Sequence, residues 1–182
     1  MITALILVES GFQDEELIYP YYRMQEEGWT VHVASPDGKE RFGKYGVPAK
    51  VSSPLMINPV YDVLFIPGGF ECPDRLRIST VVQDIVRAYH NEHKLIAAIC
   101  HGPWVLISAG ICKGRTMTGY QSIRPDLENA GAVYKDAAVV VDGNLVTAQH
   151  YKHNGVFMFE VMKLSRILNM RVEWPKHEIS HV

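Results

Sequence analysis

The chain has 182 residues, the length of one ordinary domain, with 47% hydrophobic and 21% charged residues. These fractions are close to the globular average and argue against a disordered, collagen-like or coiled-coil chain. The formal net charge of −2 gives no electrostatic reason to expect nucleic acid or an anionic membrane as a partner.

The first part of the chain alternates between short apolar runs and helical patterns. Ile2–Val8 has the pattern of a buried strand and no basic leader, so we expect a first β-strand and no secretory signal. A helix from Gln13 to Glu27 follows, and then a β-branched strand over Thr30–Ala34. The Gly-, Pro- and Lys-rich stretch 35–59 is expected to hold a small hairpin, Arg41–Phe42 with Val47–Val51.

The same alternation continues to the last helix. Strands are predicted over Asp62–Ile66 and Lys94–Ile99, and the helix between them has an apolar face made of Val82, Ile85, Val86 and Tyr89. The later elements predicted are a helix over Gly102–Ala109, a strand over Thr116–Thr118, a helix over Arg124–Asn129, and a hairpin of Ala137–Val141 with Leu145–Thr147. A final helix carries Phe157, Val161, Leu164 and Leu168 on one face.

Strands that alternate with helices indicate an α/β fold, with a mostly parallel sheet between two helical layers. No linker, repeat or low-complexity stretch interrupts the chain, so we expect one domain over 1–182, with no assigned element after about residue 169. The functional crevice of such sheets lies beyond the carboxyl ends of the strands. Site residues are therefore expected just after Val8, Ile66, Ile99 and Thr147.

A strand that ends at a cysteine and leads directly into a helix is the strongest local signal. In Ala98-Ile99-Cys100-His101-Gly102-Pro103, small residues flank Cys100, and Pro103 suits the first turn of a helix. This is the pattern of a nucleophile elbow, where the helix amino terminus stabilises a thiolate. A free cysteine is more often a small buried hydrophobe. The strand–Cys–His–Gly–Pro context favours the nucleophile.

The other two cysteines give weaker signals. Cys72 follows a Pro-Gly-Gly turn and is a candidate resolving thiol, although loop cysteines are more often bystanders. Cys112 follows the predicted helix over Gly102–Ala109 and receives no role. Three cysteines are too few for a disulfide scaffold and leave one unpaired, which favours a reducing, cytoplasmic compartment. No apolar run approaches the roughly 18 residues that a membrane span needs.

Motifs spread over nearly the whole chain before Leu168 resemble those of the ThiJ/PfpI superfamily, in particular its PfpI intracellular protease branch. The matching segments are Phe12–Pro20, Leu64–Gly69, Ala97–Pro103, Leu106–Gly110, Asn129–Gly131 and Val139–Thr147, with Tyr120, Ile123 and Asp126. The resemblance implies a flavodoxin-like three-layer sandwich of the class I glutamine amidotransferase type, with a nucleophile elbow. It also implies an oligomer, either a homodimer or a homohexamer.

The resemblance implies roles for individual residues. Cys100 matches the nucleophile of the family and His101 matches the histidine that accepts its proton. Asp74 matches an acid that reaches His101 from a neighbouring subunit. The backbone N–H groups of Gly69 and His101 are placed to hold an oxyanion, although Gly68-Gly69 taken alone reads as a tight turn.

Two positions are expected to depart from the family. Gln13 occupies the position where we expect the family's glutamate, which hydrogen-bonds the nucleophilic sulfur; a glutamine donates a hydrogen bond but moves no proton. Chemistry that needs this glutamate is therefore in question. After Thr147, the PfpI branch commonly has a short segment of basic residues and proline, whereas this chain has Ala-Gln-His-Tyr-Lys-His, which includes His150. His150 is a candidate substrate contact together with Tyr120, and the alternative is a solvated helix start.

Two other motif matches are set aside. The segment 177–181 (His-Glu-Ile-Ser-His) fits a zinc pattern but has no downstream third ligand, so no metal is expected. His90-Asn91-Glu92 fits the His-x-Glu of glutaminase triads but precedes Cys100, where those enzymes place it afterwards. No Gly-rich phosphate-binding motif is present, so no cofactor is expected.

Together with the resemblance, these patterns predict a cofactor-independent enzyme of the ThiJ/PfpI type, a cysteine-dependent hydrolase or a glyoxalase- or deglycase-like lyase. Its expected substrates are small carbonyl compounds, glycated adducts or peptides, attacked through a thiohemiacetal or thioester, in the manner of a glyoxalase, deglycase or protease. The alternative is an oxidative-stress or redox sensor in which Cys100 is oxidised without turnover. A third interpretation, an inactive interaction module, requires an unreactive Cys100.

Overall fold

Eleven strands and six helices make up the part of the chain that the structure describes. The structure is a computed structural model that describes residues 1–55 and 61–172. The strands are β1 (Thr3–Leu7), β2 (Thr30–Ser35), β3 (Arg41–Phe42), β4 (Pro48–Ala49), β5 (Ser53–Pro54), β6 (Val63–Ile66), β7 (Leu95–Ile99), β8 (Thr116–Met117), β9 (Val133–Tyr134), β10 (Val139–Asp142) and β11 (Leu145–Ala148). The helices are α1 (Asp14–Glu26), α2 (Glu71–Arg77), α3 (Thr80–Asn91), α4 (Pro103–Ser108), α5 (Arg124–Asn129) and α6 (Asn154–Val172), with 3₁₀ turns η1 (Gln121–Ile123) and η2 (Tyr151–His153).

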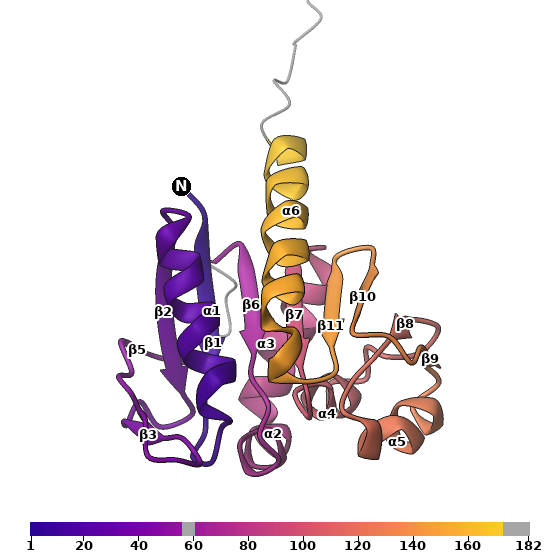
Figure 1. Cartoon of the computed structure of the whole chain (residues 1–182), viewed down its shortest axis with the longest axis horizontal. Helices are drawn as coiled ribbons and strands as arrows, with labels where there is room; N and C mark the ends of the chain where they lie inside the picture. Colours follow the sequence, from indigo (N-terminus) through magenta and orange to yellow (C-terminus); the bar gives the residue numbers. More distant parts are fainter. Residues whose placement is uncertain (56–60, 173–182) are drawn as a thin grey trace, which may run out of the picture.

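The main sheet has the strand order β10-β11-β7-β6-β1-β2-β5, and every neighbouring pair is parallel except β10 with β11. β1 and β6 are neighbours near the middle of the sheet. From β1 the chain crosses to β2, toward one edge of the sheet, and from β6 it crosses to β7, toward the other edge. Because such crossovers are right-handed, α1 and α3 lie on opposite faces of the sheet. α6 packs beside α1, and α4 beside α3, which completes the predicted three layers (Figure 1).

The central strands are buried on both faces. All residues of β6 (Val-Leu-Phe-Ile) and β7 (Leu-Ile-Ala-Ala-Ile) are buried, as expected for strands that helices cover on both sides. The Phe157 ring of α6 packs against the Phe65 ring of β6 at a centroid distance of 5.7 Å. This packing gives the strand ends at the edge of the sheet a rigid base.

The predicted fold class is confirmed, and the differences concern short elements. The structure adds α2, β5 and β9, which have too few residues to show a period, and α6 extends to Val172. The 177–181 motif lies outside the described residues. In the described ranges, no helix is long and apolar enough to cross a membrane.

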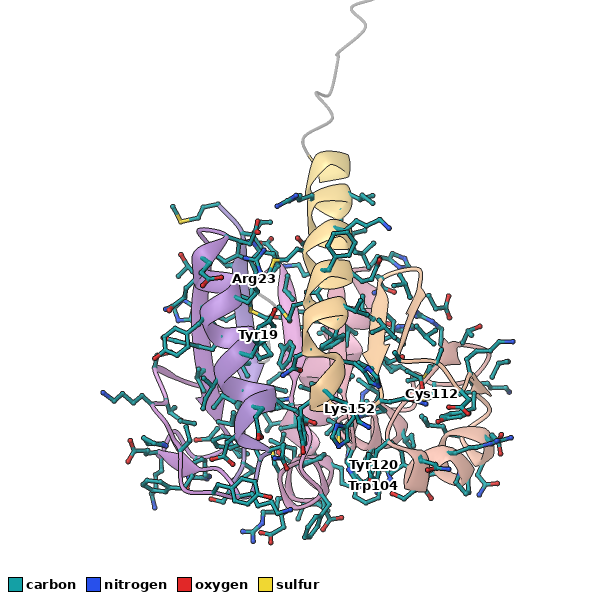
Figure 2. The ribbon with its side chains drawn as sticks, in the orientation of Figure 1. Tyr19, Arg23, Trp104, Cys112, Tyr120 and Lys152 are labelled. Carbon is teal, nitrogen blue, oxygen red and sulfur yellow. The ribbon has the colours of Figure 1, made fainter. Side chains whose placement is uncertain are left out.

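The carboxyl ends of the parallel strands meet at one edge. Ile66 at the end of β6 is level with Ala98, and Ile99 at the end of β7 is level with Ala148 of β11. The segments that leave β1, β6, β7 and β11 therefore come together there. Figure 2 shows Trp104, Tyr120 and Lys152 gathered at this edge, below the amino end of α6.

Candidate functional site

Cys100 occupies a strained turn between β7 and α4. Its φ of 61° lies in the left-handed region, which costs a residue other than glycine about 1–3 kcal/mol. Two hydrogen bonds hold this conformation: the Cys100 N–H donates to the Ala148 carbonyl at 2.9 Å, and the Tyr120 N–H donates to the Cys100 carbonyl at 2.8 Å. The elbow predicted from the sequence is present, and Cys100 is only 7% exposed.

The turn after β6 comes close to the elbow because residues 68 and 69 are glycines. A Cβ atom at Gly68 would lie 2.6 Å from the Cys100 Cβ and 2.6 Å from Glu16 Oε2, so no side chain fits there. Gly69 has a φ of +70°, which glycine adopts without strain. The Gly69 N–H thereby reaches the Cys100 sulfur, and the Gly68 N–H reaches the Glu16 carboxylate.

A buried glutamate lies against the Cys100 thiol. Glu16, in the first turn of α1, is fully buried and accepts a hydrogen bond from the Gly68 N–H at 2.8 Å. It is also hydrogen-bonded to Cys100. Burial raises the pKa of Glu16 to about 7, against the opposing effect of these hydrogen bonds.

Cys100 and Glu16 titrate as a pair. Burial, and then the charge of Glu16, raise the pKa of the Cys100 thiol, whereas hydrogen bonds from the His101 and Gly69 N–H groups to the sulfur lower it. Two acids that share one hydrogen bond lose their protons in two well-separated steps. Just above neutral pH the pair therefore holds one proton and one negative charge, and transfer of the thiol proton to the Glu16 carboxylate gives a thiolate that the two backbone donors stabilise.

His101 links the thiol to a hydroxyl group. Its Nδ1 lies 3.2 Å from Cys100 Sγ and its Nε2 lies 3.3 Å from Ser122 Oγ. The ring stacks on Tyr120 at 4.9 Å and meets the edge of Trp104 at 5.0 Å. Burial lowers the pKa of His101, while the charge of Asp126 opposes this shift. The imidazole is thus neutral at pH 7, as a proton acceptor for a thiol must be.

An open cleft of about 400 Å³ leads to the thiol. Its walls come from segments at the carboxyl edge of the sheet. The lining residues are Gln13, Glu16, Lys44, Tyr45, Gly69, Phe70, Cys100, His101, Tyr120, His150 and Tyr151. Of the residues predicted from the sequence, the cleft brings together Cys100, His101, Gly69, Gln13, Tyr120 and His150.

Asp74 is the exception among the predicted site residues. It lies on α2 with an exposed side chain, and it is not part of the cleft lining. A contribution from a neighbouring subunit is therefore still a prediction. Within this chain, the group that meets the Nε2 of His101 is the hydroxyl of Ser122, which sequence reasoning did not identify.

The expectation that this chain lacks the carboxylate beside the sulfur is wrong. The Gln13 amide lines the cleft and donates to Glu15 at 2.6 Å, whereas Glu16 contacts Cys100. The sequence does carry a signal for Glu16. Residues 16, 20 and 24 are spaced by four, and all three are buried on one face of α1, so a charged residue at the first of these positions needs an explanation.

The remaining cysteines are unlike Cys100. Cys72 is fully buried, and its sulfur accepts a hydrogen bond from the Glu9 N–H at 3.3 Å. Burial raises the pKa of Cys72 to about 12 and that of Cys112 to about 12, as it also raises the pKa of Cys100, but neither Cys72 nor Cys112 lines the cleft. No cluster of three or more metal-ligating side chains occurs among the residues that the structure describes.

Replacing Glu16 with glutamine is expected to stabilise the protein above pH 7, because the amide avoids the cost of a buried carboxylate. The pKa of Glu16 is raised from 4.5 to about 7 in the folded state. Its contribution to stability is therefore full below pH 4.5 and is lost as the pH rises to about 7. At 1.36 kcal/mol per pKa unit, the loss is about 3 kcal/mol at most.

Urea unfolding of wild type and Glu16→Gln at about pH 5 and about pH 8 measures this effect. The advantage of the variant should grow between the two pH values. Glu15→Gln, at the exposed neighbouring position, is the matched control. Its free energy of unfolding should differ from that of wild type by the same amount at both pH values. A Glu16→Gln effect that does not change with pH would contradict the assignment.

The chain is similar to known proteins over most of its length. Residues 2–164 match the profile of the DJ-1/PfpI family. Deglycase PfpI of Pyrococcus furiosus is 44% identical over 162 residues, which cover 88% of this chain and 97% of that protein. YraA of Bacillus subtilis, whose name marks it as a candidate cysteine protease, is 42% identical over 79% of this chain and 86% of its own length. The crystal structure of Drosophila melanogaster DJ-1beta superposes with a TM-score of 0.83 at 29% identity, covering 88% of each chain. The chain belongs to the DJ-1/PfpI family.

Proposed function

We propose that the protein is a cofactor-independent enzyme that uses Cys100 to attack carbonyl carbon. One observation carries this proposal: the Cys100 sulfur, at the floor of an open cleft, meets a carboxyl group, an imidazole and two backbone N–H donors. A buried thiol kept only for packing needs none of these partners. The substrates proposed are small carbonyl compounds, glycated adducts or peptides.

In the proposed first step, the Cys100 thiol gives its proton to the Glu16 carboxylate, and the resulting thiolate forms a bond to the carbonyl carbon. The π electrons of the carbonyl move to its oxygen, and we assign the N–H groups of Gly69 and His101 to stabilise the charge there. Glu16 then gives its proton to this oxygen, which leaves a neutral thiohemiacetal. With a pKa of about 7, Glu16 gives and takes protons at neutral pH.

The names of the relatives, a deglycase and a candidate cysteine protease, are both compatible with this first step. A deglycase and a cysteine protease both begin with attack of a thiolate on carbonyl carbon, and they differ in the group that leaves. Tyr120 and His150 line the cleft on one side, and we assign them to substrate contact. Their rings, at a centroid distance of 5.9 Å, form a wall against which a substrate packs.

Purified protein should consume methylglyoxal, and Cys100→Ser should lose this activity by about a thousandfold or more, because serine supplies no thiolate at neutral pH. Consumption and product are measured together. Cys112→Ser is the matched control: it changes a free buried cysteine outside the cleft lining and should keep its turnover. Full activity of Cys100→Ser would contradict the proposed mechanism.

We also propose that Asp74 of a neighbouring subunit orients His101 in a homodimer or homohexamer. Asp74 is exposed, so it is available to a partner chain. Asp74→Asn should lower kcat by at least about tenfold without dissociating the assembly, because the imidazole loses a charged hydrogen-bond partner. Kinetics together with sedimentation measure both quantities. A fully active monomer at micromolar concentration would remove Asp74 from the site and leave Ser122 as the partner of His101.

A redox sensor is the second candidate, and the hydrogen bonds to the Cys100 sulfur favour it. Donors that stabilise a thiolate also stabilise a sulfinate, which forms when two molecules of peroxide oxidise the thiolate and release two molecules of water. The turnover experiment separates the two candidates. A protein that turns over no carbonyl substrate, yet is oxidised at Cys100 ahead of Cys72 and Cys112 at low peroxide, is a sensor.

The proposed compartment is the cytoplasm. Cys72, Cys100 and Cys112 are all free thiols, as a reducing compartment maintains them. A small molecule or a peptide is the proposed partner, and neither nucleic acid nor a membrane is proposed, because the net charge is only −2.

A further inference from the structure

The cleft above Cys100 is larger and more aromatic than a three-carbon carbonyl compound requires. A volume of about 400 Å³ lies in the range of pockets that enclose drug-sized ligands. Four of its lining residues are large side chains that the fold leaves open to solvent. They are Tyr45, Phe70, Tyr120 and Tyr151, with exposed fractions of 69%, 54%, 37% and 37%.

We call these four side chains the aromatic rim. One wall of the cleft is a continuous series of rings that includes two of them, Tyr120 and Tyr151. His101 stacks on Tyr120, Tyr120 lies 5.9 Å from His150, and the His150 and Tyr151 rings are 4.0 Å apart. The series starts at His101, next to the nucleophile, and ends at the partly exposed Tyr151. A planar group bound along this wall therefore has ring faces or edges to pack against.

The rest of the rim is held in place by buried structure. Asp14 is only 4% exposed, and its carboxylate accepts from the N–H groups of Tyr45 and Val47, at 2.9 and 3.0 Å. The Lys44 N–H donates to the Phe12 carbonyl at 2.8 Å. The hairpin between β3 and β4 is thereby tied to the start of α1, which fixes where Tyr45 leaves the backbone. Phe70 directly follows Gly69, a donor to the Cys100 sulfur.

His150 supplies a polar group within this aromatic wall. Its Nδ1 accepts a hydrogen bond from the Lys152 N–H at 3.2 Å, so the proton of the neutral ring is on Nε2. Burial, together with the charges of Lys152 and His153, lowers the pKa of His150 and keeps the ring neutral, against the opposing effect of Glu15. The Nε2–H group is therefore a donor for a hydroxyl or carboxylate oxygen of the substrate.

We propose that the preferred substrates carry a planar apolar substituent directly on the reacting carbonyl group, as aryl-substituted dicarbonyl compounds do. The carbonyl lies at Cys100 and the ring lies in the aromatic rim. This proposal rests on the proposed function and specifies its substrate class. The apolar area that a phenyl ring buries, compared with a methyl group, is sufficient to raise affinity by at least about tenfold.

Mandelate and lactate test the proposal without turnover, because they share a 2-hydroxy acid and differ only by phenyl against methyl. Calorimetry on Cys100→Ser should give a dissociation constant for mandelate at least about tenfold below that for lactate. Adding Tyr45→Ala or Phe70→Ala should lower this preference by about threefold or more. Phe42→Ala is the matched control: Phe42 is a 51% exposed aromatic residue of β3 outside the cleft lining, and its loss should leave the preference unchanged.

Equal affinities for mandelate and lactate in Cys100→Ser would overturn the proposal. So would a preference that survives both rim substitutions. If a second copy of the chain covers the aromatic rim, mandelate will bind no better than lactate and Tyr45→Ala will weaken the dimer. That result would also overturn the proposal.

Turnover by the wild-type protein then distinguishes a failure of the proposed substrate class from a failure of the proposed function. A kcat/KM at least about tenfold higher for phenylglyoxal than for methylglyoxal supports both the substrate class and the proposed function. A rim-dependent mandelate preference without turnover of either compound supports the binding site and contradicts the proposed function.

Discussion

The burial of the Glu16 carboxyl group against the Cys100 thiol is the constraint on which the rest of the site depends. Two acids placed side by side away from water cannot both ionise near neutral pH. One shared proton and one negative charge remain, and backbone N–H groups of Gly68, Gly69 and His101 surround them. A nucleophile and a proton donor are thus available at the same pH, which ordinary separated thiol and carboxyl groups do not provide.

This arrangement is costly, and the fold supplies the compensation. Cys100 has a strained backbone conformation, and the buried Glu16 carboxyl group has one oxygen, Oε1, without a hydrogen-bond partner among the described residues. The parallel strands β6 and β7 are buried along their whole length. The turn after β7 is held by hydrogen bonds to β11 and to Tyr120, and the turn after β6 by hydrogen bonds of Gly68 to Gln13 and Glu16. The rigid edge of the sheet therefore maintains a site that would relax on a flexible loop.

The sheet, its order of helices and the elbow were predictable from sequence because their signals are local. A buried strand that runs into Cys100-His101-Gly102-Pro103 specifies the turn by itself. Glu16 was assigned no role because its function depends on which face of α1 is buried, and the position of α1 over Gly68 is a tertiary contact. Ser122 and α2 were missed for similar reasons: one is a single hydroxyl that meets His101 across the chain, and the other is a seven-residue helix.

The most direct test of this account is the rate at which Cys100 is alkylated as a function of pH, in wild type and in Glu16→Gln. If the pair shares one proton, the wild-type rate rises with a midpoint near the pKa of Glu16, about 7, and then stays level. Glu16→Gln should lose that midpoint and show a single transition set by the thiol alone. A wild-type midpoint above about 8.5, the ordinary range of a cysteine, that does not change in Glu16→Gln would contradict the account.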